Sequence, residues 1–271
     1  GVCVGVRAGI GRRWRRRAIK FYPRGARFKR RATLKMSRFH HAKGTAAPKL
    51  RAMNSPAQTQ LAIETCGPFA TNAFLLWNAR SAVIIDPAVG ATKLLEKARQ
   101  LQKNGVKIEA IWNTHGHFDH VCDNALWKNE FGAPVFAHAQ DEFFLEHLRE
   151  QAIWFGVAPP EVTKIDAYLK DGERVSSGEI SALVHHLPGH SPGSVAFDFG
   201  DFWISGDVLF QNSVGRVDLP GGSSEILAQS VKKLFSLPPQ NRILPGHGDA
   251  TTIGDEIQKN AIARQLLAQI G

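Results

Sequence analysis

The sequence predicts a mixed α/β fold in which sheets are covered by helices on their outer faces. Short apolar runs of strand length outnumber the segments with helical periodicity. The helical segments are also spaced regularly among those runs, as they are in layered folds. One predicted strand ends directly in a cluster of histidines and an aspartate, which gives the fold a candidate functional edge.

Three short apolar runs open the folded part of the chain. They cover residues 61–64, 72–77 and 82–85, and the last of them ends at Asp86-Pro87. Runs of this length between turn-forming residues are typical of strands joined by hairpins. We therefore expect these three runs to form hairpin-connected strands.

A helix is predicted next, over residues 91–103, and Asn104-Gly105 closes it. Its period places four apolar side chains on one face: Leu94, Leu95, Ala98 and Leu101. A strand follows at 108–112 and ends where the histidines begin. The polar cluster is therefore expected at the end of a strand.

The rest of the chain alternates between helical and strand patterns. Helical patterns cover 123–131, 139–150, 223–236 and 255–269. Strand-like runs cover 134–138, 180–187, 194–199, 202–205 and 242–244. No internal repeat with a fixed spacing stands out. This alternation completes the case for sheets with helices on their outer faces.

The positive charge of the chain is confined to its N-terminal part. The formal net charge is +10, yet residues 1–53 hold 17 of the 34 Lys and Arg and no acidic residue. Residues 54–271 carry 17 basic and 24 acidic side chains, a net charge of −7. We therefore expect a basic, disordered extension over 1–53 and one folded domain over 54–271.

Three interpretations of the extension stay open. In the first interpretation, the sequence as given begins too far upstream, and Met36 or Met53 is nearer the true beginning. Alternatively, the segment is an organelle transit peptide, because it is rich in Arg and free of acidic residues. Finally, it is an arm for nucleic acid or an anionic membrane, because clustered Arg and the aromatic Trp14, Phe21 and Tyr22 suit phosphates.

The cysteine content favours a reducing compartment. Cys3, Cys66 and Cys122 are too few and too irregularly spaced for a disulfide framework. No apolar run approaches the roughly 18 residues of a membrane span, so no membrane partner is expected. We expect a cytoplasmic protein, or an organellar one if the extension is a transit peptide.

The segment Thr114–His120 carries four potential metal ligands. His115 and His117 are two residues apart and can face the same way from an extended chain, while Asp119 and His120 follow toward a second position. Two ligand sets from one loop imply two metal ions. Imidazole and carboxylate are ligands of Zn²⁺ and its first-row neighbours, so we expect two divalent ions, zinc or else iron or manganese.

Three further ligand candidates lie downstream, each at a junction between a strand and a loop. They are His190 in Leu187-Pro-Gly-His, Asp207 in Ser205-Gly-Asp and His247 in Pro245-Gly-His. Glycine and proline at these places form tight turns that present a side chain at the end of a strand. The order and spacing of the three residues support a single converging site.

With these residues in place, the sequence resembles the metallo-β-lactamase superfamily, and within it the glyoxalase II-like hydrolases. The resemblance covers roughly residues 60–255 and implies an αββα sandwich with the site at one edge of the two sheets. It implies that one metal is held by His115, His117 and His190 and the other by Asp119, His120 and His247. By the same resemblance, Asp207 bridges the two metals.

The expected activity is hydrolysis of a thioester. Two metal ions lower the pKa of water to about 7 and so supply a hydroxide for attack on a carbonyl carbon, with Asp119 and Asp207 orienting the centre. A thiolate leaves without a proton donor, and the sequence offers no obvious dedicated acid. We therefore expect a small-molecule substrate, S-D-lactoylglutathione or a similar acyl-thiol.

The loop 211–222 resembles the Gly-Arg-x-Asp-Leu-Pro-Gly-Gly segment of compact glyoxalase II-like proteins. Arg216 either pairs with Asp218 to brace this loop or binds a substrate carboxylate. Only 24 residues follow His247, whereas classical glyoxalase II has a helical C-terminal domain that helps to bind glutathione. This departure leads us to expect a relaxed preference for the thiol carrier.

Other activities remain as alternatives. A related persulfide dioxygenase uses a single iron at positions like those of His115, His190 and Asp207, and a lactonase or another esterase is also possible. True β-lactamases of the superfamily typically carry Cys or Ser in place of Asp207, which argues against that activity. A nuclease or nucleic-acid-binding protein would use the basic extension, but the acidic domain argues against it. The oligomeric state stays open.

Several other residues of the same types are expected to be structural. His185 and His186 precede the Pro-Gly-His turn on a strand, His138 ends a strand, and His147 lies on a polar helix. Cys122 follows His120 closely, but a small buried residue that fills space is the better interpretation.

Overall fold

The first of two large sheets contains the N-terminal strands. The computed structural model describes residues 59–270, so the extension predicted over 1–53 lies outside the described residues. The sheet has the order β1-β2-β3-β4-β5-β6, with antiparallel pairing from β1 to β3 and parallel pairing from β3 to β6. Its strands are β1 Gln60–Cys66, β2 Thr71–Trp77, β3 Ser81–Ile85, β4 Lys107–Trp112, β5 Val135–His138 and β6 Ala167–Leu169.

The second large sheet contains the C-terminal strands in the order β14-β13-β10-β9-β8-β7. All of its neighbours are antiparallel except β10 and β13, which run parallel. Its strands are β7 Arg174–Ser177, β8 Ile180–His186, β9 Val195–Asp198, β10 Phe202–Gly206, β13 Arg242–Pro245 and β14 Thr251–Thr252. A small hairpin, β11 Leu209–Phe210 and β12 Ser213–Val214, stands beside this sheet.

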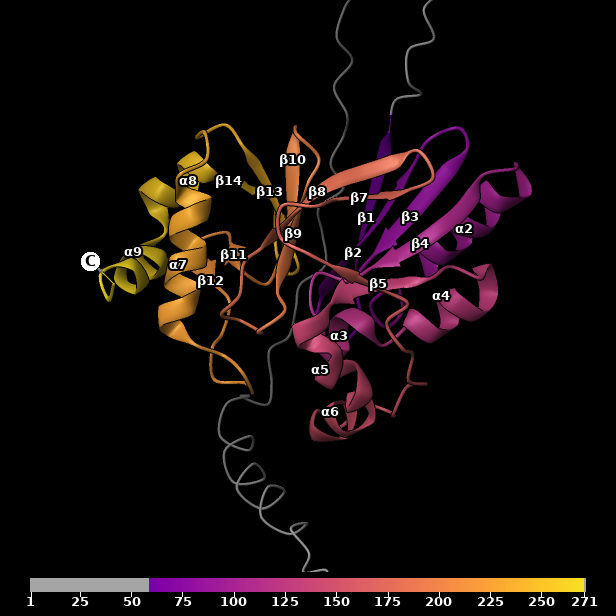
Figure 1. Cartoon of the computed structure of the whole chain (residues 1–271), viewed down its shortest axis with the longest axis horizontal. Helices are drawn as coiled ribbons and strands as arrows, with labels where there is room; N and C mark the ends of the chain where they lie inside the picture. Colours follow the sequence, from indigo (N-terminus) through magenta and orange to yellow (C-terminus); the bar gives the residue numbers. More distant parts are fainter. Residues whose placement is uncertain (1–58, 271) are drawn as a thin grey trace, which may run out of the picture. The chain divides into compact units, whose positions relative to one another are not determined.

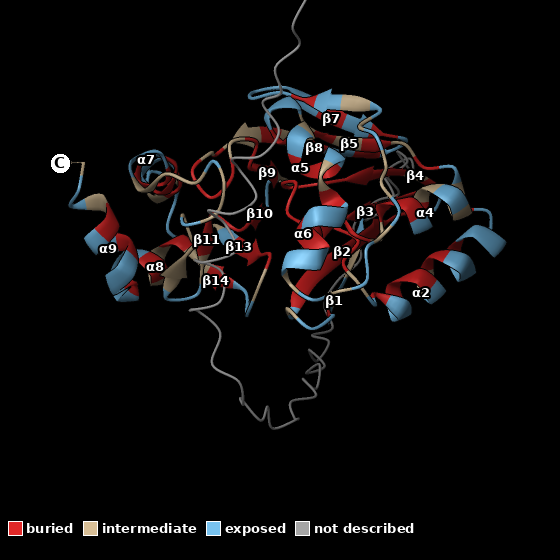
Figure 2. Cartoon of the chain, turned by 90° about the horizontal axis from the view of Figure 1, so that it is seen from below, coloured by how far each residue is buried: buried red, intermediate tan, exposed pale blue. Residues whose placement is uncertain are grey.

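Helices cover the outer faces of both sheets (Figure 1). On the first sheet lie α2 Thr92–Lys103, α3 Phe118–Val121, α4 Asn124–Phe131, α5 Glu142–Glu146 and α6 Leu148–Trp154. On the second lie α7 Ser224–Phe235, α8 Ile253–Lys259 and α9 Ala261–Leu267. Figure 2 shows that the central strands are mostly buried and that these helices turn exposed faces to solvent. The predicted αββα sandwich is confirmed.

Strand β2 shows how the sequence produces three hydrophobic layers. Because side chains alternate along a strand, Leu75 joins the core beneath the helices of the first sheet, whereas Phe74 and Leu76 enter the core between the sheets. There they meet residues of the second sheet such as Phe197. The outer face of the second sheet packs on α7 and α9 through a third core that includes Leu227.

The predicted strand positions agree with the structure to within one or two residues, but two predicted helices are divided. The pattern over 139–150 becomes a 3-10 turn, Ala139–Asp141, followed by α5 and α6. The pattern over 255–269 becomes α8 and α9, because the buried Asn260 side chain caps α9 through the Ala263 N–H. Among the described residues, none of the helices is long and apolar enough to cross a membrane.

Candidate metal centre

The seven predicted ligands meet where strands of both sheets end. His115 and His117 follow β4, and Asp119 and His120 belong to the short helix α3. The other three come from the second sheet: His190 follows β8, Asp207 follows β10 and His247 follows β13. Because β4, β8, β10 and β13 all direct their C-terminal ends to this edge, residues far apart in sequence form one cluster.

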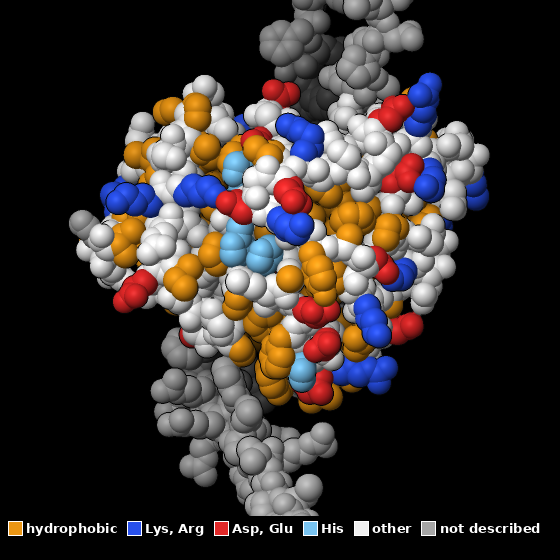
Figure 3. All heavy atoms as spheres, in the orientation of Figure 1, with side chains coloured by type: hydrophobic (Ala, Val, Ile, Leu, Met, Phe, Trp, Pro, Cys, Tyr) orange, Lys and Arg blue, Asp and Glu red, His pale blue; other side chains and the backbone are white. Residues whose placement is uncertain are grey.

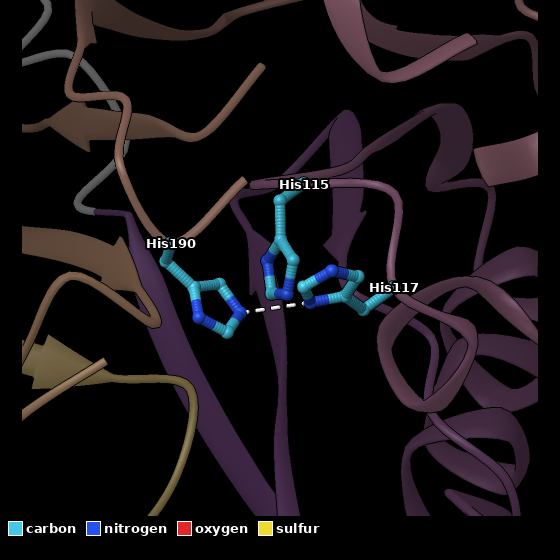
Figure 4. Close-up of side chains that lie close together, drawn as sticks. All are labelled: His115, His117 and His190. Atoms are coloured by element: carbon cyan, nitrogen blue, oxygen red, sulfur yellow. Dashed lines mark hydrogen bonds between the residues drawn. The ribbon is translucent and has the colours of Figure 1, made fainter. Parts of the chain in front are cut away.

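The first group consists of His115, His117 and His190, and one ring nitrogen from each residue lies within 4.8 Å of the other two. Figure 4 shows the three imidazoles turned toward one another. Nδ1 of His117 and Nε2 of His190 are 2.8 Å apart. All three side chains are buried, as a ligand set that excludes competing water would be.

The second group consists of Asp119, His120 and His247. Nε2 of His247 lies 3.3 Å from Oδ2 of Asp119 and 3.3 Å from Nε2 of His120. Two nitrogen ligands of one tetrahedral zinc ion lie about 3.3 Å apart, given metal–nitrogen bonds of about 2.0 Å. The spacing of this group therefore fits a single ion.

Asp207 lies between the two groups. Its Oδ2 is 3.6 Å from Nε2 of His190 and 3.3 Å from Nε2 of His247, and its Oδ1 is 3.4 Å from Nε2 of His120. One carboxylate thus faces imidazoles of both groups. This is the position that a bridging ligand requires.

Buried polar atoms without hydrogen-bond partners fit a cation site in this cluster. Nε2 of His115, Nε2 of His117 and Oδ1 of Asp207 are buried and have no hydrogen-bond partner among the described residues. Buried polar atoms in proteins are almost always paired, so several orphans in one cluster need an explanation. Divalent ions would satisfy the atoms of His115 and Asp207, and the donor set of imidazole and carboxylate fits such ions. Nε2 of His117 differs, because Nδ1 is the nitrogen of that ring that faces His190.

Burial and neighbouring charges shift the pKa values of the cluster in opposite directions. Burial, aided by His190, lowers the pKa of His117 to about 3. Burial also opposes the charge on His247, but Asp207 and Asp119 raise the pKa of this imidazole to about 11. Burial disfavours the charge of Asp119, yet His120 and His247 lower the pKa of the carboxyl to about 2. The Asp119 carboxyl is therefore stabilised in its ionised form, the form in which a carboxylate binds a cation.

Asp86 is a site residue that the sequence analysis missed, because it took Asp86-Pro87 only as the end of a strand. The side chain is fully buried and accepts hydrogen bonds from the backbone N–H and the hydroxyl of Thr114 at 2.7 and 2.6 Å. Its Oδ2 also lies 3.0 Å from Nδ1 of His120. Asp86 could form a ligand group with His115 and His120, but these contacts engage both of its oxygens. We therefore assign it to orienting His120.

The turn between β1 and β2 holds the second group, and this role was also missed. The Thr71 hydroxyl donates to Oδ2 of Asp119 at 3.0 Å, and His247 Nδ1 donates to the Phe69 carbonyl at 3.1 Å. The Asn72 amide donates to the Pro245 and Gly248 carbonyls on either side of His247, both at 2.9 Å. Sequence patterns did not reveal these roles, because each one depends on contacts between residues that are 48 or more positions apart in the chain.

The loop 211–222 reaches the first group through its backbone. Nδ1 of His190 donates to the Arg216 carbonyl at 2.8 Å, which leaves Nε2 free to bind a metal. The Arg216 guanidinium makes a two-point ion pair with Asp218 at 2.6 and 2.7 Å. This geometry is the one expected of a bracing role, and a contact of Arg216 with substrate stays a proposal.

The residues expected to be structural lie outside the three ligand groups of the described chain. His185 stacks on Trp203, His138 stacks on His186, and His147 donates to the carbonyl of Phe143 in its own helical segment. Cys122 is buried, and burial raises the pKa of its thiol. A protonated, buried thiol is a space-filling group and a poor ligand.

Several known proteins are similar to this chain in sequence or fold. A hydroxyacylglutathione hydrolase, GloC of Haemophilus influenzae, is 37% identical over 203 residues, which cover 71% of this chain and 92% of that protein. The crystal structure of TTHA1623 in a di-iron-bound form is 40% identical with a TM-score of 0.67, covering 74% of this chain and 98% of the other. The structure of BLEG-1, a B3 metallo-beta-lactamase, is 34% identical with the same TM-score and coverage.

The family is shown by a match along most of the folded domain. The sequence profile of the metallo-beta-lactamase superfamily matches residues 66–247, a range that begins at the end of β1 and ends at the last predicted ligand. The chain therefore belongs to the metallo-beta-lactamase superfamily.

Proposed function

We propose that the protein is a dinuclear metal-dependent hydrolase and that it cleaves acyl thioesters. The observation that carries this proposal is the position of Asp207 between two ligand groups, one of three imidazoles and one of two imidazoles and a carboxylate. Zinc suits both groups, and iron or manganese would also do so.

The residues around the centre would control the reaction by fixing its geometry. Two bound ions would supply Lewis acidity and a water molecule of lowered pKa. Asp207 would keep the two ligand groups in a constant relation, and Thr71 would hold the Asp119 carboxylate in place through its hydroxyl. Asp86 would keep Nε2 of His120 turned toward the cluster by binding Nδ1 of the same ring.

The proposed substrate is S-D-lactoylglutathione or a similar acyl-thiol. The identity to the hydroxyacylglutathione hydrolase of Haemophilus influenzae supports this choice. The chemistry supports it as well, since a thiolate is a good leaving group without a dedicated acid. The seven proposed ligands are all engaged in the metal centre, so none of them is free to act as that acid.

The main rival is oxidation at a single iron held by His115, His190 and Asp207. The proximity of Asp119, His120 and His247 favours two ions over one. The di-iron form of TTHA1623 means that iron by itself does not separate the two activities. β-Lactam hydrolysis is a second rival because of the identity to BLEG-1.

We also infer a small-molecule substrate and a reducing, cytoplasmic setting. On the face shown in Figure 3, acidic and basic side chains are interspersed, so this face offers no continuous basic channel for nucleic acid. Cys66 and Cys122 are unpaired and buried, as thiols in a reducing compartment commonly are.

The proposal is tested by steady-state kinetics of the metal-loaded protein on a substrate panel. The panel contains S-D-lactoylglutathione, a second acyl-thiol, a lactone, a β-lactam and a glutathione persulfide, with oxygen uptake followed for the last. We expect kcat/KM to be highest for the thioesters by at least about 100-fold, close to 3 kcal/mol of transition-state stabilisation. Oxygen consumption with persulfide, or a lactone or β-lactam as the best substrate, would replace the thioesterase assignment.

A further inference from the structure

We propose that Asp141 is a positioning residue that holds the three-histidine group together and leaves the other group unaffected. This inference rests on the metal centre proposed above. Asp141 ends the 3-10 turn that follows β5 in the first sheet, and its side chain is fully buried. The sequence analysis placed this position in an ordinary helix and gave it no role.

The Asp141 carboxylate links two loops that belong to different sheets. Its Oδ2 accepts a hydrogen bond from the Gly116 N–H at 2.8 Å and from the Ser191 hydroxyl at 2.6 Å. Its Oδ1 accepts from the Gly193 N–H at 2.6 Å. Gly116 lies between His115 and His117, and Ser191 directly follows His190. One carboxylate therefore fixes the backbone that carries all three ligands of the first group.

The glycines at these contacts have a steric reason. A Cβ atom at Gly193 would lie 2.6 Å from Cγ of Asp141, far inside normal contact distance. A Cβ at Gly116 would lie 2.9 Å from the Asp141 carbonyl oxygen and 2.8 Å from Cβ of Phe144. Both positions thus require glycine so that the loops can approach this carboxylate. The close approach of Gly116 and Gly193 to Asp141 shows that both loops are shaped to contact this residue.

The second group is held by different residues. Asp86 bonds to His120, and the Thr71 hydroxyl bonds to Asp119. None of the hydrogen bonds of the Asp141 side chain reaches Asp119, His120 or His247 within the described chain. Asp141 therefore bonds only to loops that carry the first group, whereas Asp86 bonds to His120 of the second group and, through the Thr114 hydroxyl, also supports His115 of the first. Losing Asp141 should weaken the first metal position selectively.

The test compares metal binding by the wild-type protein and by Asp141→Asn and Asp86→Asn. Asparagine keeps the shape of the side chain, but its NH₂ group cannot accept from the donors that now face one of the oxygens. We expect Asp141→Asn to raise the dissociation constant of the first metal position by about 10–100-fold, the usual effect of losing a supporting hydrogen bond. The second position should change by less than about threefold. Asp86→Asn should instead weaken the second position, and its contact with Thr114 should extend the effect to the first.

Stepwise Zn²⁺ titration against a chelator gives the two constants, and anomalous diffraction shows which position keeps its ion. Asp166→Asn is the matched control, because Asp166 accepts from the backbone N–H of Val135 at the other end of β5, and it should leave both positions unchanged. A wild-type protein that binds no metal would overturn the proposed function. A wild-type protein with two ions and an Asp141→Asn variant that keeps both, or loses both equally, would overturn the role of Asp141.

A second variant covers the case in which Asp141→Asn does not fold. Ser191→Ala removes one hydroxyl and leaves both backbone N–H donors on the carboxylate. We expect a smaller loss of about 3–10-fold, again confined to the first position. Equal weakening of both positions by Ser191→Ala would contradict the inference.

Discussion

At the scale of single residues, hydrogen bonds determine which imidazole nitrogen is available to a metal. In four of the histidines, one ring nitrogen lies 2.8 to 3.1 Å from a neighbouring oxygen atom. This oxygen belongs to the side chain of Thr114 for His115 and of Asp86 for His120. It is the backbone carbonyl oxygen of Arg216 for His190 and of Phe69 for His247. The bound nitrogen is Nδ1 in each case, so Nε2 is left for the cluster. His117 differs, because its Nδ1 faces His190.

The sequence could predict which residues meet in the cluster but not the residues that support them. Four ligand-type residues between His115 and His120, and three more at turns rich in Gly and Pro, form a pattern that few structural roles produce. Asp86 and Asp141 act by accepting hydrogen bonds from loops that are distant in sequence or in the other sheet. Such contacts depend on tertiary structure, and a single aspartate near a strand end does not reveal them.

Replacing Asp207 by alanine should damage catalysis far more than folding. The change removes the carboxylate that faces both groups, so we expect kcat/KM to fall by on the order of 100-fold or more and the metal content to fall from two ions to one. The thermal midpoint of the metal-free protein should move by about 5 °C or less. Asp201→Ala is the control, since Asp201 is an exposed residue at the opposite end of β10. Activity near wild type would show that Asp207 is not a bridge.

At the scale of elements, the periodicity of apolar residues predicted the long strands and helices but not the shortest elements. The missed strands β6, β7, β11, β12 and β14 have two to four residues, too few for an alternating pattern to stand out. The division of helices depends on side-chain contacts. Asn260 ends α8 because its amide binds the Glu256 carboxylate and the Ser213 carbonyl, the latter in a hairpin that sequence patterns do not place nearby.

Asp123, at the start of α4, should make the free energy of unfolding depend on pH. Asp123 precedes this helix, and burial raises the pKa of its carboxyl to about 6. In the unfolded chain the pKa is about 3.9, so the folded state binds the proton more tightly and loses stability as pH rises from about 4 to 6. Asp123→Asn removes the charge and keeps an acceptor oxygen for the Gly90 N–H. We therefore expect the free energy of unfolding at pH 7.5 to rise by about 1–3 kcal/mol.

Urea unfolding of the metal-free protein at pH 7.5 and at pH 4 measures this effect. The difference between Asp123→Asn and wild type should largely disappear at pH 4, where the wild-type carboxyl is protonated in the folded state. Asp201→Asn serves as the exposed control and should change neither value. A variant that is less stable than wild type at pH 7.5 would show that the favourable charge at the helix start outweighs the cost of burial.

At the scale of the whole molecule, sequence patterns predicted sheets covered by helices but not how the strands pair. The parallel pairing of β10 with β13 joins residues about 40 positions apart. Strand β4 meets the second sheet through the core between the two sheets and through a hydrogen bond from Trp112 to Ser177. Strand periodicity identifies buried faces without identifying their partners. The αββα arrangement was instead predicted from the resemblance to a known family, and that resemblance rested on the ligand motifs.

Removing residues 1–53 should leave the hydrolytic activity intact. The segment contributes no predicted ligand and has no pattern that would form a core, and the cluster is built entirely from residues beyond it. We expect kcat/KM on a small thioester to stay within about twofold of the full chain, and the metal content to be unchanged. A large fall in turnover would show that the domain boundary lies elsewhere.

The central claim is that two ligand groups sharing Asp207 hold two metal ions, and elemental analysis tests it most directly. The full chain, purified after expression with sufficient metal and dialysed without chelator, should contain close to two first-row metal ions. Seven side chains, with buried nitrogens and a carboxylate oxygen that lack partners among the described residues, predict this number. Protein that contains no metal, or only one ion under saturating supply, would contradict the account.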